Sequence, residues 1–387
     1  MIFIKNANIH TMAGKKYKKG CILINNDTIN EVGENIKIPK DTKVDIIDAK
    51  GAFVLPGMID AHCHIGLKEQ GEGKEGMDLN ETSNPITPYI RAIDGINPFD
   101  EAFKAAIKTG ITTVMTGPGS SNPIGGQFTI MKTYGKCVDN MIVKKCAAIK
   151  ASLGENPKRI YGNKSNMPIT RMGTAALIRQ TLFETKNYIM KKENSIKEKK
   201  TFEENFKLEP LIPLLKREIP MKFHVHRADD IITAIRIAKE FNILITLDHC
   251  TEGNKVLEYI KQYDIPIILG PNISFSGKVE TRNKNHETPK ILKDNNMDFA
   301  IITDHPVISI EYLPLCAGIA VKYGLDKEEA LKSITINAAK ILGLADILGS
   351  IERGKKADIL IYSGNPIDIS SKNLCTILNG EIVYKCI

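Results

Sequence analysis

Short apolar runs alternate with amphipathic stretches along most of this chain, which is the pattern of strands followed by helices. The apolar runs lie at residues 53–55, 59–64, 112–116, 143–151, 222–226, 244–248, 265–269 and 299–303. Apolar residues recur with helical spacing at 229–241, 255–262 and 326–342. Because strands that alternate with helices over about 290 residues pair in parallel, we predict an α/β fold closed as a (β/α)8 TIM barrel.

The helix expected at 326–342 has a start signal in the sequence. Asp326 is a suitable N-cap, and Glu328 and Glu329 follow in the first turn, where the helix dipole favours carboxylates. Residues 184–209, by contrast, are rich in lysine and glutamate and carry no strong apolar stripe. We expect them to form a solvated helix or a surface insertion.

The two ends of the chain have a different pattern, namely short strands joined by turns. Residues 2–4, 21–24 and 28–32 run apolar or alternate, as do residues 357–362, 374–378 and 381–384. Asn25-Asn26-Asp27 and Asn379-Gly380 are expected to form hairpin turns. We therefore predict a small β-sandwich domain built from residues 1–54 and 349–387, and a barrel domain over residues 55–348.

Composition excludes several classes of partner. The chain has 387 residues, 42% of them hydrophobic and 25% charged, which is ordinary for a globular protein. Its net charge is +8, but the lysines are scattered or gathered in one helical stretch and no basic strip is interleaved with aromatic residues, so nucleic acid is not an expected partner. No run approaches the roughly 20 apolar residues of a membrane span, and the N-terminus lacks a signal-peptide pattern. The eight cysteines form no CxxC pair, which favours reduced thiols and a cytoplasmic location.

Histidines and an aspartate follow the apolar runs where a barrel would gather them. His62 and His64 are two apart in a strand, so both imidazoles point to one face and can meet one ion. The other candidates at strand ends are His224 or His226, His249 and Asp304. Catalytic zinc sites use imidazoles and carboxylates, and in barrels the ligands come from several strand ends. The sequence therefore predicts a divalent-metal hydrolase.

A glycine-rich stretch lies near the same rim. It comprises Gly117-Pro118-Gly119-Ser120-Ser121-Asn122 and Gly125-Gly126-Gln127. We interpret it as a flexible segment that either contacts substrate or merely turns the chain. It contains no GxxxxGK[ST] pattern, so a phosphate-binding loop of that type is not predicted.

Four segments resemble the amidohydrolase superfamily, in particular its imidazolonepropionase-like and prolidase-like members. They are Val-Leu-Pro-Gly-Met-Ile-Asp-Ala-His-Cys-His at 54–64, Gly-Ile-Thr-Thr-Val at 110–114, Asn-Ala-Ala-Lys-Ile-Leu-Gly at 337–343, and Gly-Ser-Ile-Glu-Arg-Gly-Lys-Lys-Ala-Asp-Ile at 349–359. The resemblance extends over nearly the whole chain. It implies a barrel with one or two divalent ions, most commonly Zn²⁺, that hydrolyses C–N bonds in amides, cyclic amides or amino-substituted rings.

The resemblance also assigns roles to individual positions. His62 and His64 match ligands of the more buried metal, His224 and His249 match the ligands of strands five and six, and Asp304 matches the late-strand aspartate. His226 is then a neighbour that either touches substrate or bonds Asp229.

The group that bridges two metals is open between two residues. Relatives use either a carboxylated lysine or a glutamate at the fourth strand, and this chain offers Lys150 and Glu155. Lys150 lies within an apolar strand, where an unmodified ammonium is costly unless it is paired. Glu155 carries a ready carboxylate at the strand's end, and the prediction favours it slightly.

The predicted activity is hydrolysis of an amide or cyclic amide of a small molecule. Asp304 would act as general acid and base for a metal-activated water, with His226, His286 and His305 as candidates to orient substrate or support charge. Deamination of an amino-substituted ring is the first alternative, and a non-catalytic metal-binding barrel is the second. A homo-oligomer is suggested by the resemblance alone.

Overall fold

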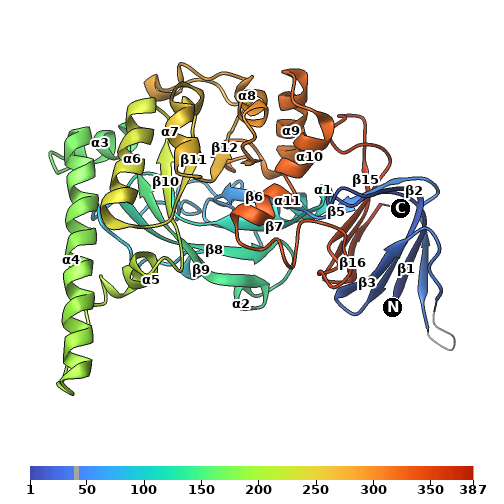
Figure 1. The fold of residues 1–387 in the computed structure, drawn as a ribbon, viewed down its shortest axis with the longest axis horizontal. Coiled ribbons are helices and arrows are strands. Elements are labelled where there is room, and N and C mark those ends of the chain that lie inside the picture. Colours follow the sequence, from blue (N-terminus) through green and yellow to red (C-terminus); the bar gives the residue numbers. More distant parts are fainter. Residues whose placement is uncertain (39–42, 387) are drawn as a thin grey trace.

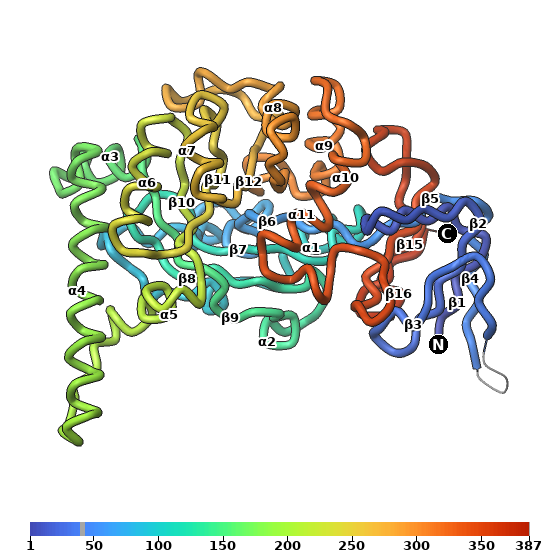
Figure 2. The backbone as a smooth tube through the Cα atoms, in the orientation of Figure 1, coloured from blue at the N-terminus to red at the C-terminus, as the bar shows by residue number. Residues whose placement is uncertain are grey.

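The computed structural model describes residues 1–38 and 43–386. Over these residues it is a mixed α/β structure with an eight-stranded barrel sheet and a second eight-stranded sheet made from both ends of the chain (Figure 1). Both termini lie at the second sheet, away from the long helix α4 (Arg171–Lys197) at the opposite end of the molecule (Figure 2). The predicted fold class is confirmed. Within the described ranges, none of the helices combines the length and apolar character needed to cross a bilayer.

The barrel strands follow one another around the sheet in chain order. They are β6 (Met58–Cys63), β7 (Ile111–Thr116), β8 (Ile124–Lys132), β9 (Ile142–Ser152), β10 (Met221–Val225), β11 (Ile245–His249), β12 (Ile267–Leu269) and β13 (Phe299–Ile301). All ladders are parallel except those of β8, which is antiparallel to both β7 and β9. The barrel therefore contains one reversed strand that simple strand–helix alternation does not predict.

Strand β8 corrects the interpretation of the glycine-rich stretch as a flexible segment. Gly125, Gly126 and Gln127 are part of this strand, and only the residues before Ile124 form a connection. Gly126 has a φ of 128°, and a Cβ there would come within 2.6 Å of the Ile90 carbonyl oxygen. The glycine is therefore required by a close backbone approach, not by flexibility.

Polar contacts join the two ends of the barrel sheet, β6 and β13. The Thr303 hydroxyl donates to Oδ2 of Asp60 at 2.5 Å, and the Thr303 N–H points to the same oxygen at 3.3 Å. The His64 N–H donates to the carbonyl of His305 at 2.8 Å. These bonds bring the residues after β6 next to those after β13, where His64 and Asp304 lie.

Helices cover the outside of the barrel. The α-helices are α1 (Glu101–Thr109), α2 (Val138–Met141), α3 (Glu155–Gly162), α4, α5 (Ile212–Leu215), α6 (Ala228–Phe241), α7 (Leu257–Gln262), α8 (Thr288–Asp294), α9 (Leu313–Lys322), α10 (Lys327–Ser333) and α11 (Ile336–Ile341). Short 3₁₀ turns are η1 (Ala92–Asp94), η2 (Glu209–Leu211), η3 (Gly253–Val256), η4 (Val279–Thr281) and η5 (Ile310–Tyr312). The solvated helix expected at 184–209 is the second half of α4, which ends at Lys197.

The prediction of a single helix at 326–342 is wrong, because two helices occupy that range. Asp326 caps α10 as expected, and its side chain accepts from the N–H groups of Glu328 and Glu329. Thr335 then leaves the helical region, with φ −137° and ψ −99°, before α11 begins. A β-branched residue whose hydroxyl bonds the Leu331 carbonyl at 2.6 Å is a local reason for the break.

The second sheet joins the N-terminal and C-terminal strands through β5 (Phe53–Pro56). Its order is β16 (Glu381–Lys385), β15 (Asn373–Leu378), β14 (Ile359–Tyr362), β5, β1 (Ile2–His10), β2 (Lys16–Asn25) and β3 (Thr28–Gly33), and β4 (Asp45–Asp48) also pairs with β1. Isoleucines from both halves, such as Ile22 and Ile359, share one core. Only Gly57 separates β5 from β6, so the chain passes directly from the second sheet into the first barrel strand.

Candidate metal centre

Three neighbouring barrel strands place polar side chains on one face at matching heights. Lys150 on β9 pairs with Lys222 on β10, and His224 pairs with Asp248 on β11. Residues paired across a ladder point to the same side, and residues two apart along a strand do so too. These four side chains therefore share one face, and all are buried. The barrel interior is polar toward the carboxyl ends of its strands.

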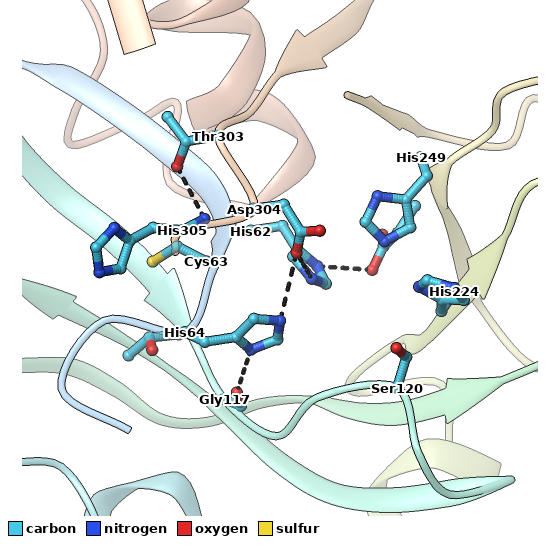
Figure 3. Close-up of polar contacts among 12 residues, drawn as sticks. His62, Cys63, His64, Gly117, Ser120, His224, His249, Thr303, Asp304 and His305 are labelled. Atoms are coloured by element: carbon cyan, nitrogen blue, oxygen red, sulfur yellow. Dashed lines mark hydrogen bonds and ion pairs between the residues drawn. The ribbon is translucent and has the colours of Figure 1, made fainter. Parts of the chain in front are cut away.

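One group of donors, centre A, consists of His62, His64 and Asp304. One ligand atom from each lies within 4.8 Å of the others. Oδ1 of Asp304 is 3.4 Å from Nε2 of His62 and 3.3 Å from Nε2 of His64 (Figure 3). Nδ1 of His64 lies 2.7 Å from the Gly117 carbonyl, which only accepts, so this nitrogen carries a proton. In neutral His64, Nε2 then carries a lone pair, and this lone pair faces a carboxylate oxygen of Asp304. Two electron-rich atoms in this position repel each other unless a cation lies between them.

A second group, centre B, consists of His224, His226 and His249. One ring nitrogen from each lies within 4.8 Å of the others. Nδ1 of His249 is 2.7 Å from the Gly270 carbonyl, and Nδ1 of His226 is 2.7 Å from the Thr251 hydroxyl. These contacts direct the Nε2 atoms toward each other, as second-shell partners do in metal sites. The contact with Thr251 also replaces the bond to Asp229 that was an alternative for His226.

The two centres are adjacent, and Lys150 faces both. The rings of His62 and His249 have centroids 5.3 Å apart. Burial lowers the pKa of His62, His224 and His249 well below the ordinary value, and the charge of Lys150 lowers all three further. Burial also lowers the pKa of Lys150 to about 8. Imidazoles with a lowered pKa are neutral near pH 7, which is the form that binds a metal.

Asp248 and Lys222 belong to this interior although sequence reasoning missed them. Oδ2 of Asp248 lies 2.9 Å from Nδ1 of His62, but the angle between the two groups does not allow a hydrogen bond. Oδ1 of Asp248 lies 3.2 Å from the Lys222 ammonium. Lys222 also donates to the Ala61 carbonyl at 3.1 Å. Lys222 is a charged residue inside a mostly apolar strand, the same signal that identified Lys150, and Asp248 directly precedes His249 at the end of another such strand. That signal could have found them.

Glu155 lies outside both centres. It is the first residue of α3, and its carboxylate accepts from the Glu280 N–H at 3.2 Å. The structure therefore does not bring this predicted ligand to the histidines. The turn after β9 places Glu155 against the loop that follows β12. Its carboxylate therefore contacts that loop across the rim and does not reach the histidines.

His286 and His305 also lie outside the two groups. The ring of His286 stacks on Tyr323 with centroids 4.7 Å apart. Nδ1 of His305 accepts from the Ile310 N–H at 3.1 Å, and burial lowers the pKa of His305 to about 4. His305 therefore stays neutral at neutral pH and has one nitrogen occupied.

Glu280 is a buried carboxylate beside centre B that the sequence did not reveal. It lies in η4, is 2% exposed, and its Oε1 is 3.6 Å from Nε2 of His224 and 3.8 Å from Nε2 of His226. It follows no apolar strand directly, since a loop of ten residues separates it from the end of β12 at Leu269. No periodicity marks such a residue as part of a site.

The donors of both centres fit a divalent cation. Within the described residues, Nε2 of His62 and of His249 and Oε1 of Glu280 are buried without a hydrogen-bond partner. Each buried polar atom left without a partner costs about 1–3 kcal/mol, so such atoms call for a ligand. Neutral imidazoles and carboxylates are the donor set that zinc and related ions take. An α/β barrel with such donors gathered at the carboxyl ends of its strands defines the class of metal-binding barrel proteins.

The chain belongs to the amidohydrolase family, whose model matches residues 171–383. The predicted superfamily is thus confirmed. Enzymes of this family are generally metal-dependent, which agrees with the donor groups described above.

Curated relatives resemble the chain over nearly its full length. It is 25% identical over 395 residues to amidohydrolase tasK of Hapsidospora irregularis, which covers 94% of this chain and 40% of that protein. It is 24% identical to an adenine deaminase of Clostridium perfringens, covering 99% of this chain and 59% of that one. It is 24% identical to an imidazolonepropionase of Picrophilus torridus, covering 90% and 86%. The chain thus spans less than two thirds of the length of the first two relatives.

A solved structure is much more similar. An amidohydrolase from Thermotoga maritima MSB8 superimposes with a TM-score of 0.97 at 42% identity, and the match covers 100% of both chains. The barrel and the second sheet are therefore both part of a fold that occurs as a unit in another amidohydrolase.

Proposed function

We propose that the protein is a metal-dependent hydrolase that cleaves a C–N bond of an amide or cyclic amide. The observation that carries this proposal is the position of Asp304, whose Oδ1 lies 3.4 and 3.3 Å from Nε2 of His62 and His64. A carboxylate beside two imidazole donors, next to a second group of three imidazoles, provides both a cation site and a proton acceptor.

Centres A and B would hold one or two divalent ions, and Zn²⁺ suits the nitrogen and oxygen donors best. Bound there, the ion would supply a Lewis acid that polarises the substrate carbonyl and lowers the pKa of water. The ligands we assign are His62, His64, His224 and His249.

Asp304 acts in this proposal as general base and then as general acid. Burial raises the pKa of Asp304, whereas positive charge at the His62 and His64 side of the carboxylate, which a bound cation would supply, lowers this pKa below its ordinary value. The side chain is therefore a carboxylate at neutral pH and can accept a proton from the attacking water. The water oxygen bonds to the carbonyl carbon, the C–N bond breaks, and the proton passes to the leaving nitrogen.

Lys150 is a better candidate than Glu155 for the bridging group. Its charge acts on imidazoles of both centres, whereas the Glu155 carboxylate is bonded to the Glu280 N–H. With its pKa lowered to about 8, about a tenth of Lys150 is neutral amine near pH 7. That amine can attack CO₂, form an N–C bond and release a proton, which yields a carboxylate on the side chain.

Deamination of an amino-substituted ring is the second candidate. The similarity to an adenine deaminase favours it, and the same centres and the same Asp304 would serve. The similarity to an imidazolonepropionase favours the cyclic amide. Substrate contacts by His226, His286 and His305, association into a homo-oligomer, and the cytoplasmic location stay predictions.

The two products distinguish the two reactions. Protein stripped with a chelator and reconstituted with Zn²⁺ would be assayed on lactams, N-acyl amino acids and dipeptides, and separately on aminopurines and aminopyrimidines. We expect carboxylate and amine from the first set, with no turnover before Zn²⁺ is returned. Ammonia from the second set alone would establish the deaminase, and tightly bound metal without any turnover would favour the non-catalytic barrel.

A further inference from the structure

We propose that Glu280 is a metal ligand at centre B, where it would bind the same cation as His224 and His226. This inference rests on the proposed metal-dependent function and goes beyond it. It assigns a ligand from the loop after β12, and it makes His226 a ligand and not a substrate contact.

The burial of Glu280 is the first observation. Its side chain is 1% exposed, yet Oε1 has no hydrogen-bond partner among the described residues. A buried carboxylate oxygen without a hydrogen bond is costly, so a group that compensates its charge is expected beside it. A cation between Oε1 and the neighbouring imidazole nitrogens would compensate that charge.

The distances match the separation of ligands on one ion. Zn–N and Zn–O bonds are about 2.0–2.2 Å, so two ligands of a tetrahedral ion lie about 3.4 Å apart. Oε1 of Glu280 lies 3.6 Å from Nε2 of His224 and 3.8 Å from Nε2 of His226. These separations exceed the tetrahedral value by a few tenths of an ångström, which a small rotation of the side chains removes.

The rest of the carboxylate is held by Glu155 and Gly154. Oε2 of Glu280 accepts the Glu155 N–H at 2.9 Å, and the Glu155 carboxylate accepts the Glu280 N–H in return. Gly154 has a φ of 84°, and a Cβ there would come within 2.5 Å of Oε2 of Glu280. One oxygen is therefore fixed by backbone contacts across the rim, and the other is left pointing toward His224 and His226.

Lys278 offers a competing explanation, because its ammonium lies 3.7 Å from Oε1 of Glu280. Its side chain is 37% exposed, so much of its charge is solvated, and the contact exceeds hydrogen-bond length. A simple ion pair also gives no reason for Oε1 to lie against two imidazole nitrogens. If Lys278 merely competes with the ion, its removal will not weaken metal binding.

The inference is tested by counting and titrating metal, not by activity. Wild-type protein and the Glu280→Gln, His226→Asn and Lys278→Gln variants would be stripped of metal and titrated with Co²⁺. Affinity comes from calorimetry, coordination from the visible absorption of Co²⁺, and stoichiometry from elemental mass spectrometry. Glu252→Gln is the matched control, since Glu252 is a buried acid of a neighbouring loop that bonds Lys255 and the Ala228 N–H.

Glu280→Gln should lower the affinity of one Co²⁺ by at least about 10-fold and change its absorption spectrum, since even second-shell changes cost about 10- to 100-fold. His226→Asn should do the same, whereas Lys278→Gln and Glu252→Gln should not weaken binding. In Lys150→Ala, centre B should still hold one ion, because it has a carboxylate of its own.

Three results would overturn the inference. Unchanged Co²⁺ affinity and spectrum in Glu280→Gln would do so, as would equal losses in Glu280→Gln and Lys278→Gln, which indicate a structural ion pair. A raised KM in Glu280→Gln with unchanged metal content would make the residue a substrate contact. A wild-type protein that binds no metal would instead refute the proposed function itself, so the two failures are distinguishable. Thermal unfolding of each metal-free variant identifies any that fail to fold.

Discussion

Asp304→Asn should abolish turnover while leaving the metal in place. Asparagine keeps an oxygen where Oδ1 of Asp304 lies, 3.3–3.4 Å from Nε2 of His62 and His64, so a donor for the cation remains. The amide cannot accept a proton at neutral pH, so the general base and acid is lost. Only the proton-transfer step is removed.

The size of the loss follows from that role. A positioned general base contributes about 10²- to 10⁴-fold, which corresponds to about 2.7–5.5 kcal/mol of transition-state free energy. We expect Asp304→Asn to lower kcat by a factor within this range. Because Asp304 acts on the proton and does not hold the bound substrate, KM should change by less than about threefold. The variant should contain as much metal as the wild type.

The assay is a steady-state measurement of kcat and KM on the substrate found by the product screen, with metal content measured on the same samples. Asp326→Asn is the matched control, since Asp326 is the N-cap of α10 and asparagine caps a helix about as well as aspartate. A kcat within threefold of wild type in metal-loaded Asp304→Asn would refute the assigned role. Loss of the metal together with activity would make Asp304 chiefly a ligand.

Three further outcomes are expected. Lys150→Ala should lower kcat by at least about 10-fold. With ¹³C-bicarbonate, only the wild type should give the NMR signal of a carbamate. A carbamate signal that persists in Lys150→Ala would exclude Lys150 as the carboxylated residue. Removing the metal should lower the Tm by a few degrees, since a ligand at 100 times its Kd adds about 2.7 kcal/mol, and an unchanged Tm would argue against a site formed only in the folded state. Burial raises the pKa of Asp60 from 3.8 to about 7, so the folded state holds this proton more tightly than the unfolded state. This proton contributes about 4 kcal/mol to the free energy of unfolding, a contribution that is fully present below pH about 4 and is lost as pH rises to about 7. Urea unfolding of the metal-free wild type should therefore give a lower free energy of unfolding at pH 7.5 than at pH 5. Metal-free Asp60→Asn should not show this decrease.

Much of the site was predictable from local sequence patterns. His62 and His64 share a strand face because side chains alternate with a period of two, and the apolar runs before His224, His249 and Asp304 mark them as residues at or just after strand ends. Parallel strands gather such ends at one rim, so the pattern alone places these residues near each other. The strand-rich ends of the chain likewise predicted a second sheet built from both termini.

Other features depend on contacts between distant segments. Strand β8 runs antiparallel to its neighbours, and no period in its sequence records the direction of a strand. Glu155 stands where a ligand was expected, but the turn at Gly154 directs its carboxylate to the backbone of a loop 125 residues away. That loop in turn brings Glu280 to His224 and His226.

The sequence by itself determined the general alternation of strands and helices and the imidazoles at the strand ends, because those follow from local periodicity. Only the tertiary structure decided which carboxylates reach them. A loop residue is positioned by the hydrogen bonds and close packing of its partners, and neither leaves a periodic trace along the chain.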